Sequence, residues 1–159
     1  MLAAAWLTLG DDALRLYLDL NCFNRPFDDQ TQDPVARETE AVFTILQRII
    51  DGVDGLVWSA ILDFENGQHP LLDRRNEIAR WAIFAAARVA IDPQLSTRAH
   101  ELEAFGLRPL DAAHLASAEA AGCDRFLTCD DQLTRKARAV KMKVVVQNPT
   151  EYIAEQSHA

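Results

Sequence analysis

The sequence predicts a three-layer α/β/α fold, in which helices cover both faces of a mainly parallel sheet of four or five strands. Short apolar segments alternate along the chain with longer segments whose apolar residues recur at helical spacing. This alternation favours parallel strands joined by helical crossovers. The chain has 159 residues, 49% of them hydrophobic, which suits one core rather than two. We therefore expect one domain over residues 14–159, preceded by an N-terminal extension at residues 1–13.

Four segments have the short, apolar character of buried strands. The first covers residues 14–20 and ends before the turn indicated by Asn24, Arg25 and Pro26. The others are residues 55–59, residues 125–128 and residues 143–146. In a parallel sheet covered by helices, ligands bind at the carboxyl ends of the strands, so we look for a functional site there.

The segments between these strands are predicted to be helices. Asp33 and Pro34 suit a helix start, and apolar residues then recur at helical spacing up to Gly52. An alanine-rich helix begins at Asp111 and closes at Gly122. The other predicted helices are residues 60–66, residues 78–89, residues 97–105 and a basic helix after Asp130. The expected order is β-α-β-α-α-α-β-α-β.

The charge of the chain argues against nucleic-acid binding driven by charge alone. Sixteen basic and twenty-four acidic residues give a net charge of -8, which repels a phosphate backbone at long range. One segment, residues 131–143, is clearly positive and offers a polyanion a place to approach, or else is a solvated helix face. Its basic residues are Arg135, Lys136, Arg138, Lys141 and Lys143.

Cysteine usage and hydropathy favour a cytoplasmic protein. Cys22, Cys123 and Cys129 are an odd number without C-x-x-C spacing, so they indicate neither a disulfide framework nor a zinc knuckle. Residues 1–10 are apolar but lack a basic leader, and we expect a loose extension rather than a signal peptide. No stretch approaches the roughly 18 to 20 apolar residues that span a bilayer, so we expect no membrane insertion.

Four acidic residues are expected to meet at one edge of the sheet. Asp19 and Asp130 each lie at the end of a predicted strand, while Asp111 and Glu65 belong to neighbouring helices. Clustered carboxylates in a crevice are unfavourable unless a cation neutralises them. Oxygen ligands suit Mg²⁺ or Mn²⁺, whereas zinc would recruit histidine or cysteine, and the histidines show no paired ligand spacing.

Each acid also has a purely structural interpretation. Asp111 could cap its helix, Asp130 could begin a turn or cap the helix that follows, and Glu65 could be a surface acid. Asp19 is the hardest to explain in this way, because a charged residue in a buried parallel strand needs a partner or a function. The coincidence of all four at one edge therefore carries more weight than any one of them.

The motifs around these acids resemble those of the PIN domain family. Residues 16–21, LYLDLN, resemble the family's opening strand with Asp-x-Asn, and residues 59–65, SAILDFE, its serine followed six residues later by glutamate. Residues 110–118, LDAAHLASA, resemble its third motif, an Asp that opens a helix of small residues. The Thr-x-Asp of residues 126–130 and the final strand with its Asn-Pro turn are similar too.

The resemblance covers residues 15–153 and implies a ribonuclease that depends on Mg²⁺ or Mn²⁺ and cleaves single-stranded RNA. It further implies a VapC-type toxin with an antitoxin partner, and a homodimer. The implied catalytic and metal-binding residues are Asp19, Glu65, Asp111 and Asp130. Residues implied to bond metal ligands or substrate are Asn21, Ser59, Thr128, Arg135 and Lys136.

Three alternatives stay open at this level. Asp63 or Glu40 could supply the second acid in place of Glu65, because Asn66 and Gly67 cut the predicted helix short. The chain could be a catalytically inactive PIN-like module that binds RNA or protein. It could also be a phosphatase with Asp19 as nucleophile, although such enzymes carry Asp-x-Asp where this chain has Asn21, and no partner lysine is evident.

Overall fold

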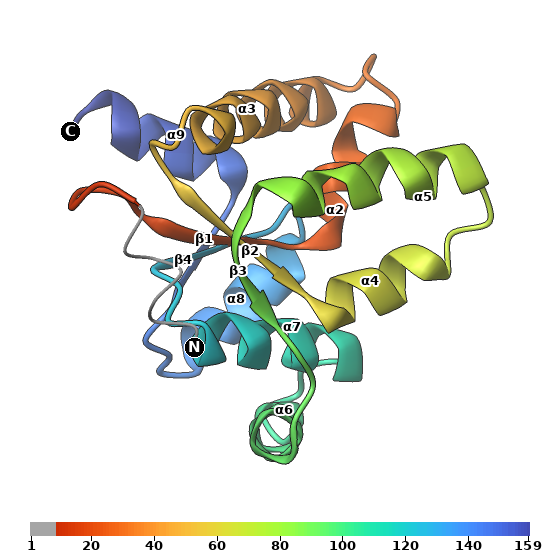
Figure 1. The fold of residues 1–159 in the computed structure, drawn as a ribbon, viewed down its shortest axis with the longest axis vertical. Coiled ribbons are helices and arrows are strands. Elements are labelled where there is room, and N and C mark those ends of the chain that lie inside the picture. The colour runs from red at the N-terminus through yellow and green to blue at the C-terminus, as the bar shows by residue number, and fades with distance from the viewer. Residues whose placement is uncertain (1–8) are drawn as a thin grey trace.

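The computed structural model describes residues 9–159, so residues 1–8 of the predicted extension lie outside the described residues. Its centre is a five-stranded, wholly parallel sheet in the order β3-β2-β1-β4-β5 (Figure 1). The strands are β1 Arg15–Leu18, β2 Gly55–Ser59, β3 Ala85–Val89, β4 Arg125–Leu127 and β5 Val145–Gln147. This sheet confirms the predicted fold class.

Helices cover both faces of the sheet. The helices α3 and α9 pack together on one face, and α6 and α7 pack together on the other (Figure 1). The α-helices are α2 Leu20–Asn24, α3 Asp33–Ile50, α4 Ala60–Gly67, α5 Leu72–Ala79, α6 Pro93–Glu103, α7 Pro109–Ala120, α8 Asp131–Ala139 and α9 Pro149–Ser157. Two 3₁₀ turns, η2 Arg25–Phe27 and η3 Arg80–Phe84, follow α2 and α5. Among residues 9–159, no helix combines the length and apolar composition needed to cross a bilayer.

The central strands β1 and β2 form the core of the sheet. Every residue of β2 is buried, and Leu16, Tyr17 and Leu18 of β1 are completely buried. Such continuous burial is typical of parallel strands that are covered on both faces. The ring of Tyr17 stacks on that of Phe126 in β4, with 5.2 Å between centroids. A phenol is therefore fixed deep in the sheet, directly below the carboxyl end of β1.

The strand order places the switch point of the sheet between β1 and β4. From β1 the chain moves outward to β2 and β3, then returns to the other side of β1 to form β4 and β5. Such a reversal leaves an opening where the loops after the two strands diverge. Asp19 follows β1 immediately, and Thr128 follows β4. The topology thus brings the first and fourth motifs to one place.

The prediction of a single helix over residues 78–89 is wrong. The chain instead forms the end of α5, the turn η3, and then the edge strand β3, which pairs in parallel with β2. Ala85, Ala86 and Ala87 have no intrinsic strand preference, so the local sequence resembles a helix. Pairing with the buried β2 overrides that local preference.

Other element bounds also differ from the predictions. Asp19 does not interrupt β1 but follows it, with its amide donating to Leu127 O at 2.9 Å, and Asp130 lies beyond the end of β4. The last strand ends at Gln147, and the chain then forms α9, which was not predicted. Asn148 caps α9 by accepting from the amide of Thr150 at 2.9 Å. The Asn-Pro turn is thus a helix start as well as a strand end.

Candidate metal centre

The carboxylate of Asp19 is buried and receives hydrogen bonds only from neutral groups among the described residues. Its Oδ2 accepts from Thr128 Oγ1 at 2.8 Å and from Asn21 Nδ2 at 3.1 Å, and the residue is 5% exposed. Burial raises the pKa of Asp19, and the negative charges of Glu65 and Asp111 raise it further, against the lowering by His114, which acts when its ring is protonated, and by the Thr128 hydrogen bond. A cation placed here would relieve both the burial cost and the repulsion.

Asn21 and Thr128 fix Asp19 by joining the exits of β1 and β4. Asn21 Nδ2 donates to Thr128 Oγ1 at 2.9 Å, and Asn21 Oδ1 accepts from the amide of Cys129 at 3.0 Å. Thr128 Oγ1 also accepts from the amide of Asp130 at 3.1 Å. The side-chain amide of Asn21 therefore uses both its nitrogen and its oxygen in hydrogen bonds. Its role is therefore to orient Asp19 and hold the two loops together.

Glu65 reaches Asp19 from α4, where it lies beside His114 of α7. Glu65 Oε2 is 2.9 Å from His114 Nε2, and one ligand atom from each of Asp19, Glu65 and His114 lies within 4.8 Å of the others. The helix α4 starts at the end of β2, where Ser59 Oγ accepts from the amide of Leu62 at 3.1 Å. This cap sets the direction of the helix that carries Glu65.

Beneath the carboxylates, Tyr17 connects Ser59 to His114. The Tyr17 hydroxyl is 2.6 Å from Ser59 Oγ and 2.6 Å from His114 Nδ1. Burial raises the pKa of Tyr17 well above its usual value, with a smaller opposing effect from the Ser59 hydrogen bond. The phenol therefore keeps its proton and acts as a hydrogen-bond donor.

The two remaining predicted acids, Asp111 and Asp130, share one guanidinium. Arg108 Nε donates to Asp111 Oδ2 at 2.8 Å, and Arg108 Nη2 donates to Asp130 Oδ2 at 3.2 Å. The Arg108 side chain is 70% exposed, so this pairing is open to solvent and to competition by another cation. Asp130 also caps α8 through Leu133 N at 3.1 Å, whereas Asp111 lies in the first turn of α7 and caps nothing.

The predicted acids thus have different surroundings. Asp19 and Glu65 belong to one compact group, Asp111 acts on Asp19 through its charge, and Asp130 is connected through Thr128 and Arg108. Asp63, the alternative second acid on α4, accepts from Trp58 Nε1 at 2.8 Å instead. The second alternative, Glu40, lies exposed on α3.

The other predicted site residues divide into buried and exposed ones. Ser59 is buried and bonded to Tyr17, so it supports the site from below rather than facing substrate. Arg135 is exposed on α8, and Lys136, also exposed, donates to Gly106 O at 3.2 Å. The first basic residue of α8, Arg135, therefore lies five residues after Asp130.

The sequence reasoning missed two residues of the site, His114 and Arg108. Residues three apart on a helix lie on the same face, and both residues are three positions from Asp111. That spacing was a usable signal for His114. The contact between Arg108 and Asp130 spans different elements and depends on the fold.

A carboxylate-rich group of this kind fits a divalent cation. Asp19, Glu65 and His114 are the only group of three or more potential ligands that the described residues bring so close. Two of the three offer carboxylate oxygens, and Asp111 and Asp130 lie nearby. Such a set favours Mg²⁺ or Mn²⁺ over a soft metal.

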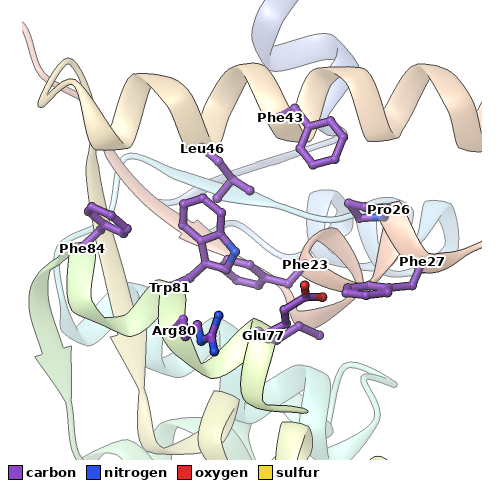
Figure 2. Close-up of a pocket in the computed structure, with 10 residues that line it drawn as sticks. Phe23, Pro26, Phe27, Phe43, Leu46, Glu77, Arg80, Trp81 and Phe84 are labelled. Carbon is purple, nitrogen blue, oxygen red and sulfur yellow. The ribbon is translucent and has the colours of Figure 1, made fainter. Parts of the chain in front are cut away.

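A second hollow lies beyond α2, away from the carboxylates. It has a volume of about 450 Å³ and is lined by aromatic and aliphatic side chains from α2, η2, α3, α5 and η3. Figure 2 shows Leu46 of α3 pointing toward Trp81 of η3, with Phe43 farther along α3 and Phe23 of α2 beside the Trp81 ring. We call this hollow the aromatic groove. Phe27, Phe43 and Phe84 of this lining are exposed.

The fold and the acidic centre define an α/β protein with a candidate metal site at the switch point of its sheet. The model of the PIN domain family matches residues 16–139, and the chain belongs to this family. Among solved structures, the chain is similar to one in the crystal structure of VapBC2 from Rickettsia felis bound to a DNA fragment from their promoter. That match has a TM-score of 0.55 and 12% identity over 85% of this chain and 98% of the other, and it supports the fold. No curated protein sequence matches the chain.

Proposed function

We propose that this chain is an endoribonuclease that uses Mg²⁺ or Mn²⁺ to hydrolyse phosphodiester bonds in single-stranded RNA. The observation that carries the proposal is the buried Asp19 carboxylate, which lies beside Glu65 and receives only neutral donors within the described residues. PIN domains are nucleases that use divalent metals, and the donor set fits such an ion. The cation would supply the positive charge that the neutral hydrogen-bond donors of Asp19 do not provide.

In this proposal the four acids hold the ion directly or through water, with Asp19 and Glu65 innermost. A divalent cation lowers the pKa of a bound water and neutralises charge on the phosphate oxygens. Asn21 and Thr128 hold Asp19 in a fixed orientation through bonds of 3.1 and 2.8 Å. The products would carry a 5′-phosphate and a 3′-hydroxyl, as the family resemblance implies.

RNA would approach across α8. Arg135 and Lys136 are exposed there, five and six residues after Asp130, and would contact phosphates beside the cleaved bond. Arg138, by contrast, is paired with Glu151 at 2.9 Å. The net charge of -8 makes this local basic face the place where a polyanion can approach.

The decisive experiment compares acids inside and outside the proposed site. Asp19→Asn keeps the size of the side chain but removes a metal ligand, so we expect cleavage of single-stranded RNA in Mn²⁺ to fall by more than about 100-fold. Asp111→Asn, Asp130→Asn and Glu65→Gln should also abolish cleavage. The matched controls Asp63→Asn and Glu40→Gln should cleave like the wild type. Full activity of Asp19→Asn would refute the mechanism, and loss in Asp63→Asn with normal Glu65→Gln would reassign the second acid.

We further propose that the protein is cytoplasmic and forms homodimers. We also propose that it binds a protein partner, an antitoxin, which places apolar side chains in the aromatic groove. The exposed aromatic side chains favour such a partner, and α2 connects the groove floor at Phe23 directly to Asp19. A partner there could restrain the segment that carries the site. The inactive-module alternative would keep this partner but lack Mn²⁺-dependent cleavage.

The partner proposal is tested with Phe43→Ser, since Phe43 is 57% exposed and its loss costs the free protein little. We expect this change to weaken binding to the purified product of a neighbouring small gene by more than about 10-fold, as for an aromatic anchor. Phe105→Ser is the matched control, because Phe105 is 60% exposed but lies outside the groove. Equal binding by both variants, measured by calorimetry, would place the partner elsewhere.

Light scattering of the free protein tests the homodimer.

A further inference from the structure

We propose that His114 is a positioning residue, which holds the Glu65 carboxylate for the cation without binding the cation itself. It does so through a buried chain of hydrogen bonds that runs from Ser59 through Tyr17 and His114 to Glu65. The inference rests on the proposed metal-dependent function and adds a residue to it.

The chain is continuous and short at every step. Ser59 Oγ lies 2.6 Å from the Tyr17 hydroxyl, which lies 2.6 Å from His114 Nδ1, and His114 Nε2 lies 2.9 Å from Glu65 Oε2. Ser59, Tyr17 and His114 are each at most 1% exposed, so water does not compete for these bonds. The chain joins the end of β2 and the centre of β1 to α7 and α4.

One arrangement of protons satisfies all of these contacts with a neutral imidazole. Glu65 Oε2 is an acceptor, so His114 Nε2 carries the hydrogen, and Nδ1 of the neutral ring is then an acceptor. Tyr17 donates to Nδ1, and its oxygen accepts from Ser59. Ser59 Oγ accepts in turn from the amide of Leu62. The Glu65 carboxylate, which can only accept, thus sets the direction of the bonds from His114 to Tyr17, and the Ser59 hydroxyl is left to donate to Tyr17.

The same contacts argue against His114 as a metal ligand. A histidine ligand offers one ring nitrogen to the ion and donates from the other. Here Nδ1 is bonded to Tyr17 and Nε2 to Glu65, so neither nitrogen is free without breaking the chain. Glu65 uses only Oε2 in this contact, and its second carboxylate oxygen can face the ion.

Glu65 needs such support because of its position. Its side chain is 28% exposed and lies near the end of α4, a helix of eight residues. An unrestrained glutamate samples several rotamers and loses that freedom when it binds an ion. His114, fixed at both nitrogens, removes part of this entropy loss before the ion arrives. It also holds α4 against α7, the helix that carries Asp111.

Two substitutions of His114 test the contacts of its two ring nitrogens separately. His114→Gln places an amide NH₂ near the former Nε2 and can still donate to Glu65, whereas His114→Asn places a polar group near the former Nδ1 and cannot reach Glu65. Each variant breaks one buried hydrogen bond of the chain, so they are matched for general damage. Thermal melting in EDTA checks that both variants fold.

The readout is Mn²⁺ binding by calorimetry without RNA. We expect His114→Asn to bind Mn²⁺ about 10-fold more weakly than the wild type, as for the loss of a residue that orients a ligand, and His114→Gln to stay within about threefold. Equal affinities of His114→Asn and the wild type would overturn the proposal. Equal and severe losses in both variants would also overturn it, because that is the behaviour of a ligand.

Tyr17→Phe provides a second test in case a His114 variant fails to fold. It retains the ring that stacks on Phe126 and removes only the hydroxyl that donates to His114 Nδ1. We expect ¹⁵N NMR of the wild type to show His114 protonated at Nε2 alone, and Tyr17→Phe, in which Nδ1 has lost its donor, to bind Mn²⁺ more weakly. Protonation at Nδ1 alone in the wild type would refute the chain.

The outcomes distinguish this inference from the proposed function. If the wild type binds Mn²⁺, Asp19→Asn does not, and His114→Asn binds normally, the metal site stands and only the role of His114 is wrong. If the wild type binds no Mn²⁺, the proposed function fails, and the role of His114 fails with it.

Discussion

The two ends of β2 each lie beside a buried carboxylate, but the two carboxylates are neutralised differently. At the amino end, Asp54 is 2% exposed and accepts from Arg48 Nε at 2.8 Å and from the Tyr152 hydroxyl at 2.7 Å. At the carboxyl end, Asp19 is almost as buried, but its donors Thr128 and Asn21 are neutral. Asp54 thus receives a hydrogen bond from a cationic side chain of the chain, whereas Asp19 receives hydrogen bonds from neutral side chains alone among the described residues.

Under the proposed function, this difference separates a structural acid, Asp54, from a metal-binding acid, Asp19. Burying a charge costs several kcal/mol unless a partner compensates, so a chain that folds with Asp19 ionised sacrifices stability there. Arg48 and Tyr152 join α3 and α9 to the start of β2, which is a purely structural function. Under the proposed function, Asp19 gains a comparable partner when a cation binds.

Neutralising the two acids should therefore change stability in opposite directions. Asp54→Asn leaves the partly buried Arg48 without its carboxylate, and we expect a loss of about 2 kcal/mol in the free energy of unfolding, after allowing for its exposure to solvent. Asp19→Asn removes a repelled charge, so the metal-free variant should be more stable than the wild type. Urea unfolding of metal-free protein measures both. Destabilisation by Asp19→Asn as large as that by Asp54→Asn would show that Asp19 is a structural acid too.

The cation should stabilise the wild type and leave the other end of β2 unaffected. At a Mn²⁺ concentration ten times the dissociation constant, mass action predicts a gain of about 1.4 kcal/mol in the free energy of unfolding. The gain should vanish in Asp19→Asn and persist in Asp54→Asn, as measured by melting with increasing Mn²⁺. An unchanged melting curve at millimolar Mn²⁺, together with no calorimetric binding, would contradict the metal site.

The smallest expected effect is a pH dependence confined to Asp19. Burial raises the pKa of Asp19, so the folded protein holds this proton more tightly than the unfolded chain does. The stability contributed by this group is present at low pH and is lost as pH rises from its unfolded pKa through its raised folded pKa. The stability advantage of metal-free Asp19→Asn over the wild type should therefore grow as the pH rises above the unfolded pKa of about 4, and should level off above the raised folded pKa. A constant difference across this range would argue against the raised pKa.

Patterns along the chain predicted the layers of the fold and the four acids, for reasons that are local. Apolar runs such as residues 55–59 are continuous because parallel strands are buried on both faces, and helical spacing marks α3 equally clearly. Asp19 was noticeable because a charge next to a buried strand is costly. Apolar runs, helical spacing and an isolated charge can all be read from the order of residues along the chain.

Tertiary structure decided the rest, because it depends on contacts between distant segments. The alanines of β3 are extended only because β2 provides a partner, and α9 packs on α3 at the far end of the chain. The hydrogen-bond chain through Tyr17 and His114 joins residues 97 positions apart, and the contact between His114 and Glu65 joins residues 49 apart. The motifs in the sequence predicted which side chains lie at the ends of the strands. Only the packing of β1, α4 and α7 against one another decided that Asp19 and Glu65 share one site while Asp54 is closed off by Arg48.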